Sequence, residues 1–159
     1  METLRVLVAV DASPASDRAV EYTGRVLGTL EGVQLYLVHV VGPLPDGVRA
    51  APGETLTNTR RDEQAAWMAT AREDARGVLE RAAQRLRSAG IDERAISLRT
   101  AELANGTVAT CVLEAARDLD CDTIVVGREA ITWVPNLLHP HIGERVVREA
   151  THAAVWIVA

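Results

Sequence analysis

The chain has 159 residues, of which 48% are hydrophobic and 25% charged, and its formal net charge is −5. This length and composition predict one globular domain, 1–159, with a single core. The negative charge argues against nucleic acid or an anionic membrane as the main partner. All 17 basic residues are arginine, which excludes a phosphate-loop lysine, a lysine Schiff base and a lysine general base.

The cysteines and the amino-terminal segment indicate the cellular compartment of the protein. Cys111 and Cys121 are too few for a disulfide framework or a zinc site, and we interpret them as reduced thiols of the core. The apolar segment 4–10 contains Arg5 and ends at Asp11, unlike a signal peptide. No run approaches the ~18 apolar residues of a membrane span, so we expect a cytoplasmic protein.

Short β-branched apolar segments alternate with segments of helical period along the chain. In chain order the sequence predicts a strand at 4–10, a helix at 17–30, a strand at 33–41, a helix at 61–89, a strand at 96–101, a helix at 106–119, a strand at 123–126, a helix at 142–151 and a strand at 154–158. This α/β alternation predicts a doubly wound, open parallel sheet of five strands with helices on both faces.

The first two helices have recognisable apolar stripes. The stripe of the first consists of Ala19, Thr23, Val26, Leu27 and Leu30, and that of the second of Ala65, Met68, Ala75, Leu79, Ala82 and Leu86. The connection between them from Gly42 to Arg60 holds three prolines and three glycines and is too long for an ordinary turn. We predict a surface lid or flap there.

Asp11 is the first candidate for chemistry because it follows the first strand. Ligands of doubly wound sheets bind beyond the carboxyl ends of the strands, so Asp11 could accept hydrogen bonds from a ligand's hydroxyls or base. The alternative is turn and cap chemistry, in which Ser13 caps a helix whose first position is Pro14. Asp11 and Ser13 could divide the two roles, and both interpretations stay open.

The stretch after the fourth strand holds the remaining candidates. Gly127 either lets the backbone approach a phosphate or merely lets the chain turn. His139 and His141, with Glu129 or Glu144, lack a third ligand at recognisable spacing, so we predict no metal. His141 could instead lie near the helix cap or face a phosphate in the cleft.

The two tryptophans near the carboxyl end are interpreted as packing residues. Trp133 closes its loop over the core more readily than it stacks on a ligand. Trp156 lies in the last strand, and if that strand is a sheet edge, a second subunit is its natural cover. None of the motifs typical of serine hydrolases, phosphate loops, dinucleotide folds or C-x-x-C redox sites occurs, so we predict neither an enzyme nor a catalytic residue.

Four segments together resemble the universal stress protein family: VAVDASPAS at 8–16, His39-Val40, AARDLDCDTIVVG at 115–127 and GERVVREATHAAVWIVA at 143–159. The resemblance spans nearly the whole chain. It implies an adenine nucleotide alpha hydrolase-like sheet in the order 3-2-1-4-5. It also implies a homodimer formed through the final strand, which consists of Ala154, Val155, Trp156, Ile157 and Val158.

Family members that bind ATP carry the motif G-x-x-G-x9-G-[ST] after the fourth strand, and this chain is similar but degenerate there. Gly127 is kept, Ala130 stands at the second glycine, and Pro140-His141 replaces the final pair. Ala130 adds a Cβ, Pro140 removes a backbone donor and His141 brings a larger ring. The chain looks closer to the branch named after the founding member, which lacks the motif, and tight ATP binding is not expected.

The adenosine end of the pocket is better kept, because Asp11 and Val40 match positions that contact base and ribose in nucleotide-binding members. Gly127, Ala130, His141 and Ile142 complete the predicted site. We expect a non-enzymatic regulatory homodimer without a cofactor, acting through its own assembly or a regulatory protein partner. The alternative is a stress sensor that binds ATP or AMP with altered phosphate contacts; a slow nucleotide hydrolase or transferase comes third.

Overall fold

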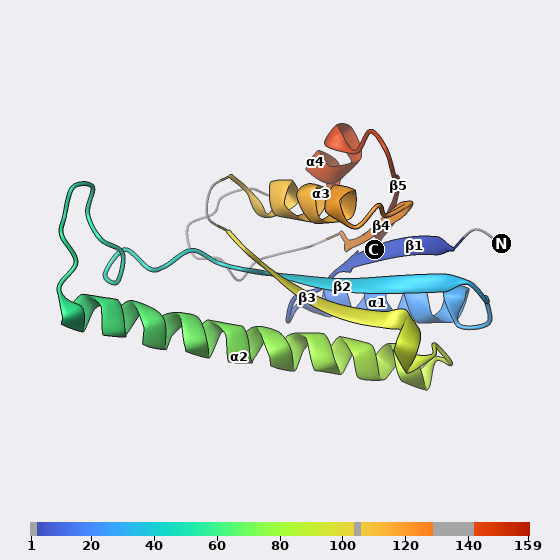
Figure 1. The fold of residues 1–159 in the computed structure, drawn as a ribbon. Helices are drawn as coiled ribbons and strands as arrows, with labels where there is room; N and C mark the ends of the chain where they lie inside the picture. Colours follow the sequence, from blue (N-terminus) through green and yellow to red (C-terminus); the bar gives the residue numbers. More distant parts are fainter. Residues whose placement is uncertain (1–2, 104–105, 129–141) are drawn as a thin grey trace.

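The computed structural model describes residues 3–103, 106–128 and 142–159, which form a five-stranded parallel sheet in the order β3-β2-β1-β4-β5 (Figure 1). The strands are β1 (Leu4–Ala9), β2 (Val33–Val41), β3 (Ile96–Glu102), β4 (Thr123–Gly127) and β5 (Ala154–Val158). The helices are α1 (Pro14–Leu27), α2 (Asn58–Ser88), α3 (Val108–Asp118) and α4 (Ile142–Glu149), with a short 3-10 helix, η1 (Glu93–Ala95), before β3. The predicted fold class and strand order are confirmed.

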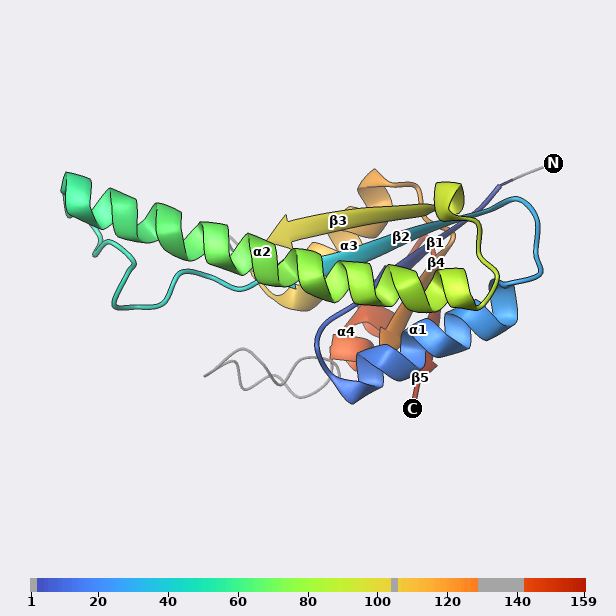
Figure 2. The ribbon, with the colours of Figure 1, turned by 90° about the horizontal axis from the view of Figure 1, so that it is seen from below.

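Helices cover both faces of the sheet: α1 and α2 lie on one side and α3 and α4 on the other (Figures 1 and 2). The central strand β1 is apolar on both faces for this reason. Val6 and Val8 belong to the core on the α1 and α2 side, whereas Leu7 belongs to the core on the α3 and α4 side, and all three are fully buried. Alternate residues of a strand point to opposite faces, so a strand between two cores is apolar on both faces. The prediction of a single core was wrong, because the sheet separates the buried residues into one core on each of its faces.

α1 begins at Pro14, three residues before the predicted periodic segment, because Ser13 caps it as the cap interpretation of this turn predicted. The Ser13 hydroxyl accepts a hydrogen bond from the Ser16 N–H at 3.1 Å, and proline at the first helical position needs no donor. The predicted far end was wrong: the helix stops at Leu27, and Leu30 lies outside it, 53% exposed. Val26 was also wrongly placed in the stripe, since it is 38% exposed beside the buried Leu27.

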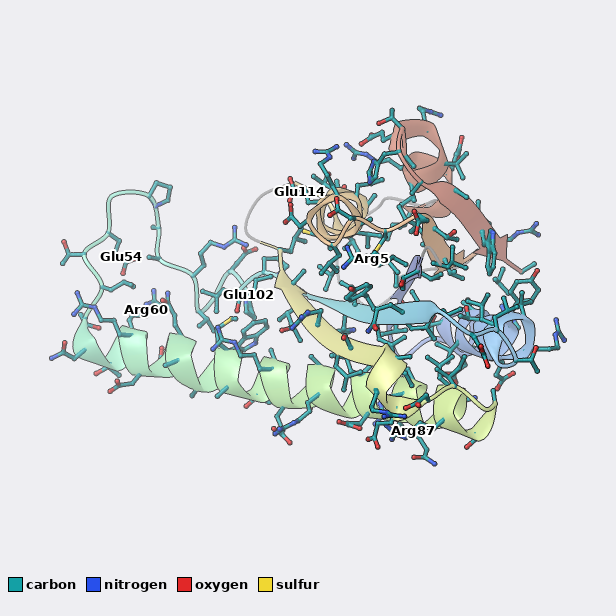
Figure 3. All side chains as sticks on the ribbon, turned by 45° about the vertical axis from the view of Figure 1, so that its right-hand side comes forward. Arg5, Glu54, Arg60, Arg87, Glu102 and Glu114 are labelled. Carbon is teal, nitrogen blue, oxygen red and sulfur yellow. The ribbon has the colours of Figure 1, made fainter. Side chains whose placement is uncertain are left out.

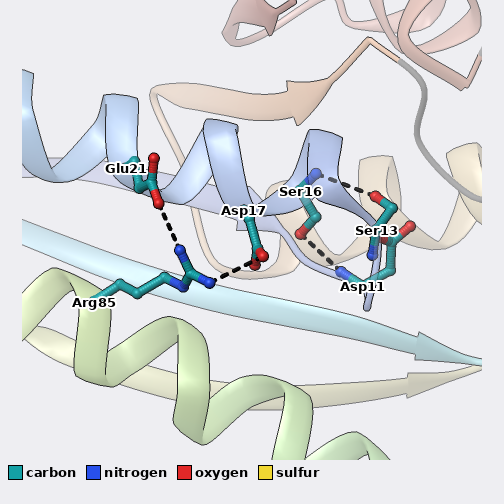
Figure 4. A network of polar contacts seen from close by, with 6 residues as sticks. All are labelled: Asp11, Ser13, Ser16, Asp17, Glu21 and Arg85. Carbon is teal, nitrogen blue, oxygen red and sulfur yellow. Dashed lines mark hydrogen bonds and ion pairs between the residues drawn. The ribbon is translucent and has the colours of Figure 1, made fainter.

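Small residues allow the carboxyl end of α1 to approach the carboxyl end of α2 closely. A Cβ at Gly24 would lie 2.7 Å from Ala89 Cβ, and one at Gly28 would collide with the carbonyl oxygen of Ala89. The carboxyl ends of the two helices therefore touch through backbone. Farther along, the guanidinium of Arg85 on α2 bridges Asp17 and Glu21 of α1 (Figure 4).

Only the second half of α2 packs on the sheet; the first half projects well beyond it (Figures 1 and 2). Ala75, Leu79 and Leu86 are buried, whereas no residue from 43 to 74 is. Ala65 was therefore wrongly assigned to a core stripe, because nothing of the sheet lies beneath that part of the helix. The part of α2 before Ala75 is called the overhang below, and Figure 3 shows Glu54 and Arg60 near its far end.

The long connection from 42 to 57 lies along the overhang. The Arg60 guanidinium donates to the carbonyl oxygen of Gly47 at 2.9 Å, and the Gln64 amide donates to that of Val48 at 2.9 Å. Thr57 then caps α2, its hydroxyl accepting from the Arg60 N–H at 3.3 Å. The predicted surface position is confirmed, and its observed contacts are with α2.

Both cysteines are buried free thiols, as predicted. Burial, reinforced by Glu114, raises the pKa of the Cys111 thiol, and burial raises the pKa of the Cys121 thiol to about 11. The thiolate is the reactive form, so neither group is suited to nucleophilic chemistry at neutral pH. Within the described ranges, no helix combines the length and the apolar character needed to cross a membrane.

Stability is expected to fall between about pH 9 and pH 11 because of Cys121. Above its ordinary pKa of 9.0 the unfolded chain releases the thiol proton, whereas the folded chain keeps it up to a pKa of about 11. The native state then binds more protons, so alkali favours unfolding, by roughly 3 kcal/mol at the upper end. Urea denaturation across this range should show a steeper loss for the wild type than for Cys121→Ala; parallel curves would contradict the assignment.

Candidate functional site

The carboxyl ends of β1, β2 and β4 meet the first turns of α1, α3 and α4 around one small cavity of about 20 Å³. Its lining consists of Ala9, Val10, Asp11, Ser16, Val38, His39, Val40, Val108, Val112, Gly127 and Ile142. Four of the six predicted site residues are in this set: Asp11, Val40, Gly127 and Ile142. Ala130 and His141 lie outside the described residues, as do Glu129, Trp133 and His139.

Asp11 takes part in the turn chemistry that was one of its two predicted roles (Figure 4). Its Oδ1 accepts from the Ser13 N–H at 2.7 Å, and its own N–H donates to the Ser16 hydroxyl at 2.9 Å. The cycle is closed by the helix cap, in which the Ser13 hydroxyl accepts a hydrogen bond from the Ser16 N–H. This cycle of short-range hydrogen bonds fixes the Asp11 carboxyl group between β1 and α1.

The second carboxyl oxygen of Asp11 is not used by the turn. Asp11 is only 6% exposed, and its Oδ2 is buried without a hydrogen-bond partner among the residues that the structure describes. A buried polar atom left unpaired costs roughly 1–3 kcal/mol, and such atoms are few in native proteins. Within this cavity a ligand hydroxyl or amino group would supply the missing donor.

His39 is a cavity residue that the site prediction missed. Its ring Nδ1 lies 2.8 Å from the carbonyl oxygen of Val10, and because a carbonyl only accepts, this nitrogen carries the proton. The ring is 8% exposed and braces the end of β2 against the segment after β1. A histidine within the apolar run at the end of β2 was the available signal, since a buried polar side chain needs a reason that an apolar one does not.

Gly127 has a structural reason to be glycine that neither sequence interpretation contained. A Cβ there would lie 2.6 Å from the carbonyl oxygen of Ala15 and 2.7 Å from its carbonyl carbon. Real Cβ atoms do not approach backbone so closely. The residue therefore allows the first turn of α1 to pack directly on the end of β4, without any ligand being involved.

Val40 and Ile142 form apolar walls of the cavity, 4% and 8% exposed respectively. The enclosed volume is enough for about one water molecule and far below the ~300 Å³ of a small-molecule pocket. A nucleoside could enter only if lining groups moved. Among the described residues no three His, Cys, Asp or Glu side chains are grouped as a metal site requires.

The sequence pattern of the family described as "Universal stress protein family" matches residues 2–159. The chain belongs to this family. The resemblance seen in the sequence is thereby confirmed, and the sheet is the adenine nucleotide alpha hydrolase-like arrangement of universal stress proteins. No curated protein matches the chain.

Solved universal stress proteins share the fold at low sequence identity. One from Burkholderia pseudomallei is 23% identical with a TM-score of 0.68, over 97% of this chain and 94% of that one. One solved in complex with cAMP is 22% identical with a TM-score of 0.67, over 100% and 99% of the two chains. A third, from Archaeoglobus fulgidus in complex with dAMP, is 19% identical with a TM-score of 0.62, over 100% of both.

Proposed function

We propose that this universal stress protein is a non-enzymatic regulator that binds the nucleoside part of an adenine nucleotide beside Asp11, without a tight hold on the phosphates of ATP. One observation carries the proposal: the buried Oδ2 of Asp11 has no donor among the described residues and belongs to a cavity at the carboxyl ends of the strands. A ribose hydroxyl is a donor of the right kind and size.

Weak phosphate binding is proposed from the residues after β4. Gly127 packs against the backbone of Ala15, which accounts for its being glycine without any contact to a phosphate. Ala130 and Pro140 stand where the ATP motif of the family has glycine, so a Cβ is added and a backbone donor lost. The structurally similar proteins solved with cAMP and dAMP are complexes with monophosphates. These points favour AMP over ATP as the ligand.

A regulatory rather than catalytic role is proposed because the chain contains no lysine and no catalytic motif. A cytoplasmic location is part of the same proposal. It is supported by the two buried thiols, which are not paired in a disulfide and would stay reduced in that compartment.

A homodimer through β5 is also part of the proposal, and the two edge strands of the described sheet support it. β5 contains neither a charged residue nor a proline, whereas β3 exposes Arg99 and Glu102 along its length. Charged residues protect an edge from pairing, so β5 is the unprotected edge. Pairing β5 with β3 of another copy would give an open chain of molecules, whereas β5 with β5 closes as a two-fold dimer.

Asp11→Asn is the variant that tests the ligand assignment. The amide oxygen can still accept from Ser13, but the group replacing Oδ2 becomes a donor and can no longer receive a ligand hydroxyl. AMP binding, measured by calorimetry, should weaken roughly 10- to 100-fold. The ligand-free variant should be more stable than the wild type, because a neutral amide nitrogen left without a partner in this cavity costs less than a carboxylate oxygen in the same place.

Asp118→Asn, which removes an exposed carboxylate on α3, is the matched control and should change neither quantity. Equal AMP affinity in Asp11→Asn and the wild type would remove Asp11 from the site. Wild-type binding of ATP tighter than AMP would overturn the weak-phosphate assignment. No binding of AMP, ADP or ATP up to millimolar concentration would end the nucleotide proposal as a whole.

A further inference from the structure

Ile157, near the end of β5, is 42% exposed although its strand is part of the sheet. Its side chain lies over the first turn of α4. A Cβ at Gly143 would be 3.4 Å from Ile157 Cδ1 and 3.6 Å from Cγ2 of Val126, so the helix begins directly on these two residues. The start of α4 therefore rests partly on a residue of the open edge.

The same turn of α4 forms a wall of the cavity beside Asp11. Ile142 is the first residue of α4 and lines the cavity, and Gly143 follows it. Only one turn of helix therefore separates the apolar edge of the molecule from the candidate ligand site. Val147 lies one turn after Gly143, on the same side of the helix, and is 50% exposed.

Binding of a nucleoside requires lining groups of the cavity to move, because the cavity is too small for one. The cavity of about 20 Å³ has to enlarge, and Ile142 is one of the side chains that close it. Displacing Ile142 displaces Gly143 with it, and thereby the surface against which Ile157 packs. A second copy paired along β5 would bury Ile157 and hold that surface in place.

We propose that self-association through β5 and ligand binding beside Asp11 oppose each other through the first turn of α4. The inference rests on the proposed function, since it concerns regulation of the same site. Each process stabilises a different position of Ile142: the dimer stabilises the closed wall, and the ligand an open one. By linkage, the ligand must weaken the dimer by the same factor by which the dimer weakens ligand binding.

The test is AMP binding by the full chain at protein concentrations below and above the dimer dissociation constant, with sedimentation velocity on the same samples. Dilution into the monomer should tighten AMP binding roughly fivefold or more, and saturating AMP should weaken the dimer by the same factor. Ile157→Glu should be monomeric and bind AMP with the affinity of the diluted wild type. Val147→Glu, on the helix surface, serves the same purpose if the strand variant does not fold.

Leu30→Glu is the control, because Leu30 is an exposed apolar residue of comparable accessibility that belongs neither to β5 nor to α4. This variant should dimerise and bind AMP as the wild type does. Equal AMP affinity in monomer and dimer, tighter binding in the dimer, or dimers formed by both edge variants would overturn the inference while leaving the ligand proposal intact. Absence of AMP binding in every variant would overturn both, and calorimetry on the monomers alone would reveal it.

Discussion

Replacing Gly127 with alanine is expected to lower the free energy of unfolding by roughly 1–3 kcal/mol, the cost of forcing atoms into a well-packed core. The added Cβ would meet the carbonyl oxygen of Ala15 at 2.6 Å and its carbonyl carbon at 2.7 Å. These are backbone atoms in the first turn of α1, so they cannot move aside as a flexible side chain would. Either α1 or the end of β4 must shift.

The same shift should reach the ligand site. The hydrogen bonds of Asp11 to Ser13 and Ser16 hold its carboxyl group to the beginning of α1. A displaced α1 therefore moves Asp11 relative to β2 and α4, and AMP binding should weaken together with stability. Urea denaturation and calorimetry on the same variant measure the two effects.

Gly47→Ala is the matched control for Gly127→Ala. A Cβ at Gly47 would meet nothing within 4 Å, and its backbone lies outside the positive-φ region. Its free energy of unfolding should stay within roughly 0.5 kcal/mol of the wild type, as at ordinary surface positions. If Gly127→Ala were as well tolerated as this control, the close packing of α1 on β4 would not be what requires glycine.

Leu86→Ala should be the most damaging simple truncation in α2, lowering the free energy of unfolding by roughly 2–5 kcal/mol. Leu86 is fully buried between the sheet and α1, and its Cδ2 lies 3.6 Å from the position of a Cβ on Gly24. Removing its methyl groups leaves a cavity that the backbone contacts of the two helices prevent from closing. Urea denaturation measures the loss.

Met68→Ala is the comparison within the same helix. Met68 lies on the overhang and was wrongly predicted as a core residue, since it is only half-buried, in a cavity that it lines with Glu102 and Leu103. Its truncation should reduce stability by less than roughly 1 kcal/mol. Equal losses for Leu86→Ala and Met68→Ala would show that the overhang is as tightly integrated as the half that covers the sheet. That result would contradict the division of α2 into two parts.

Much of the fold could be predicted, because the periodicity of each segment reports the surface on which it lies. Most residues of β1 and β2 are apolar on both faces, and the stripe of Ala75, Leu79 and Leu86 is spaced for one helix face. The predictions failed where a helical pattern of apolar residues continued past the end of the helix or past the sheet on which the helix packs. Leu30 and Ala65 fit the pattern of their helices but lie past the end of α1 or past the edge of the sheet.

The candidate site was predicted in part. Asp11, Val40, Gly127 and Ile142 could be named because residues at strand ends meet at one edge of a parallel sheet and the family resemblance selects among them. His39 was missed, since a side chain within a strand gives no sign of which neighbour it reaches. The roles of Asp11 could not be separated either, because the sequence does not distinguish one carboxyl oxygen from the other.

The sequence by itself determined the family, the five-stranded parallel fold and the absence of lysine chemistry, because these depend on composition and on patterns local to each segment. Only the tertiary structure decided that Asp11 Oδ2 is left without a described partner, that Gly127 is required by the approach of Ala15, and that Ile157 packs against the first turn of α4. Each of these facts depends on how segments far apart in the sequence come together. Such distances are set when the elements pack, and no local pattern encodes them.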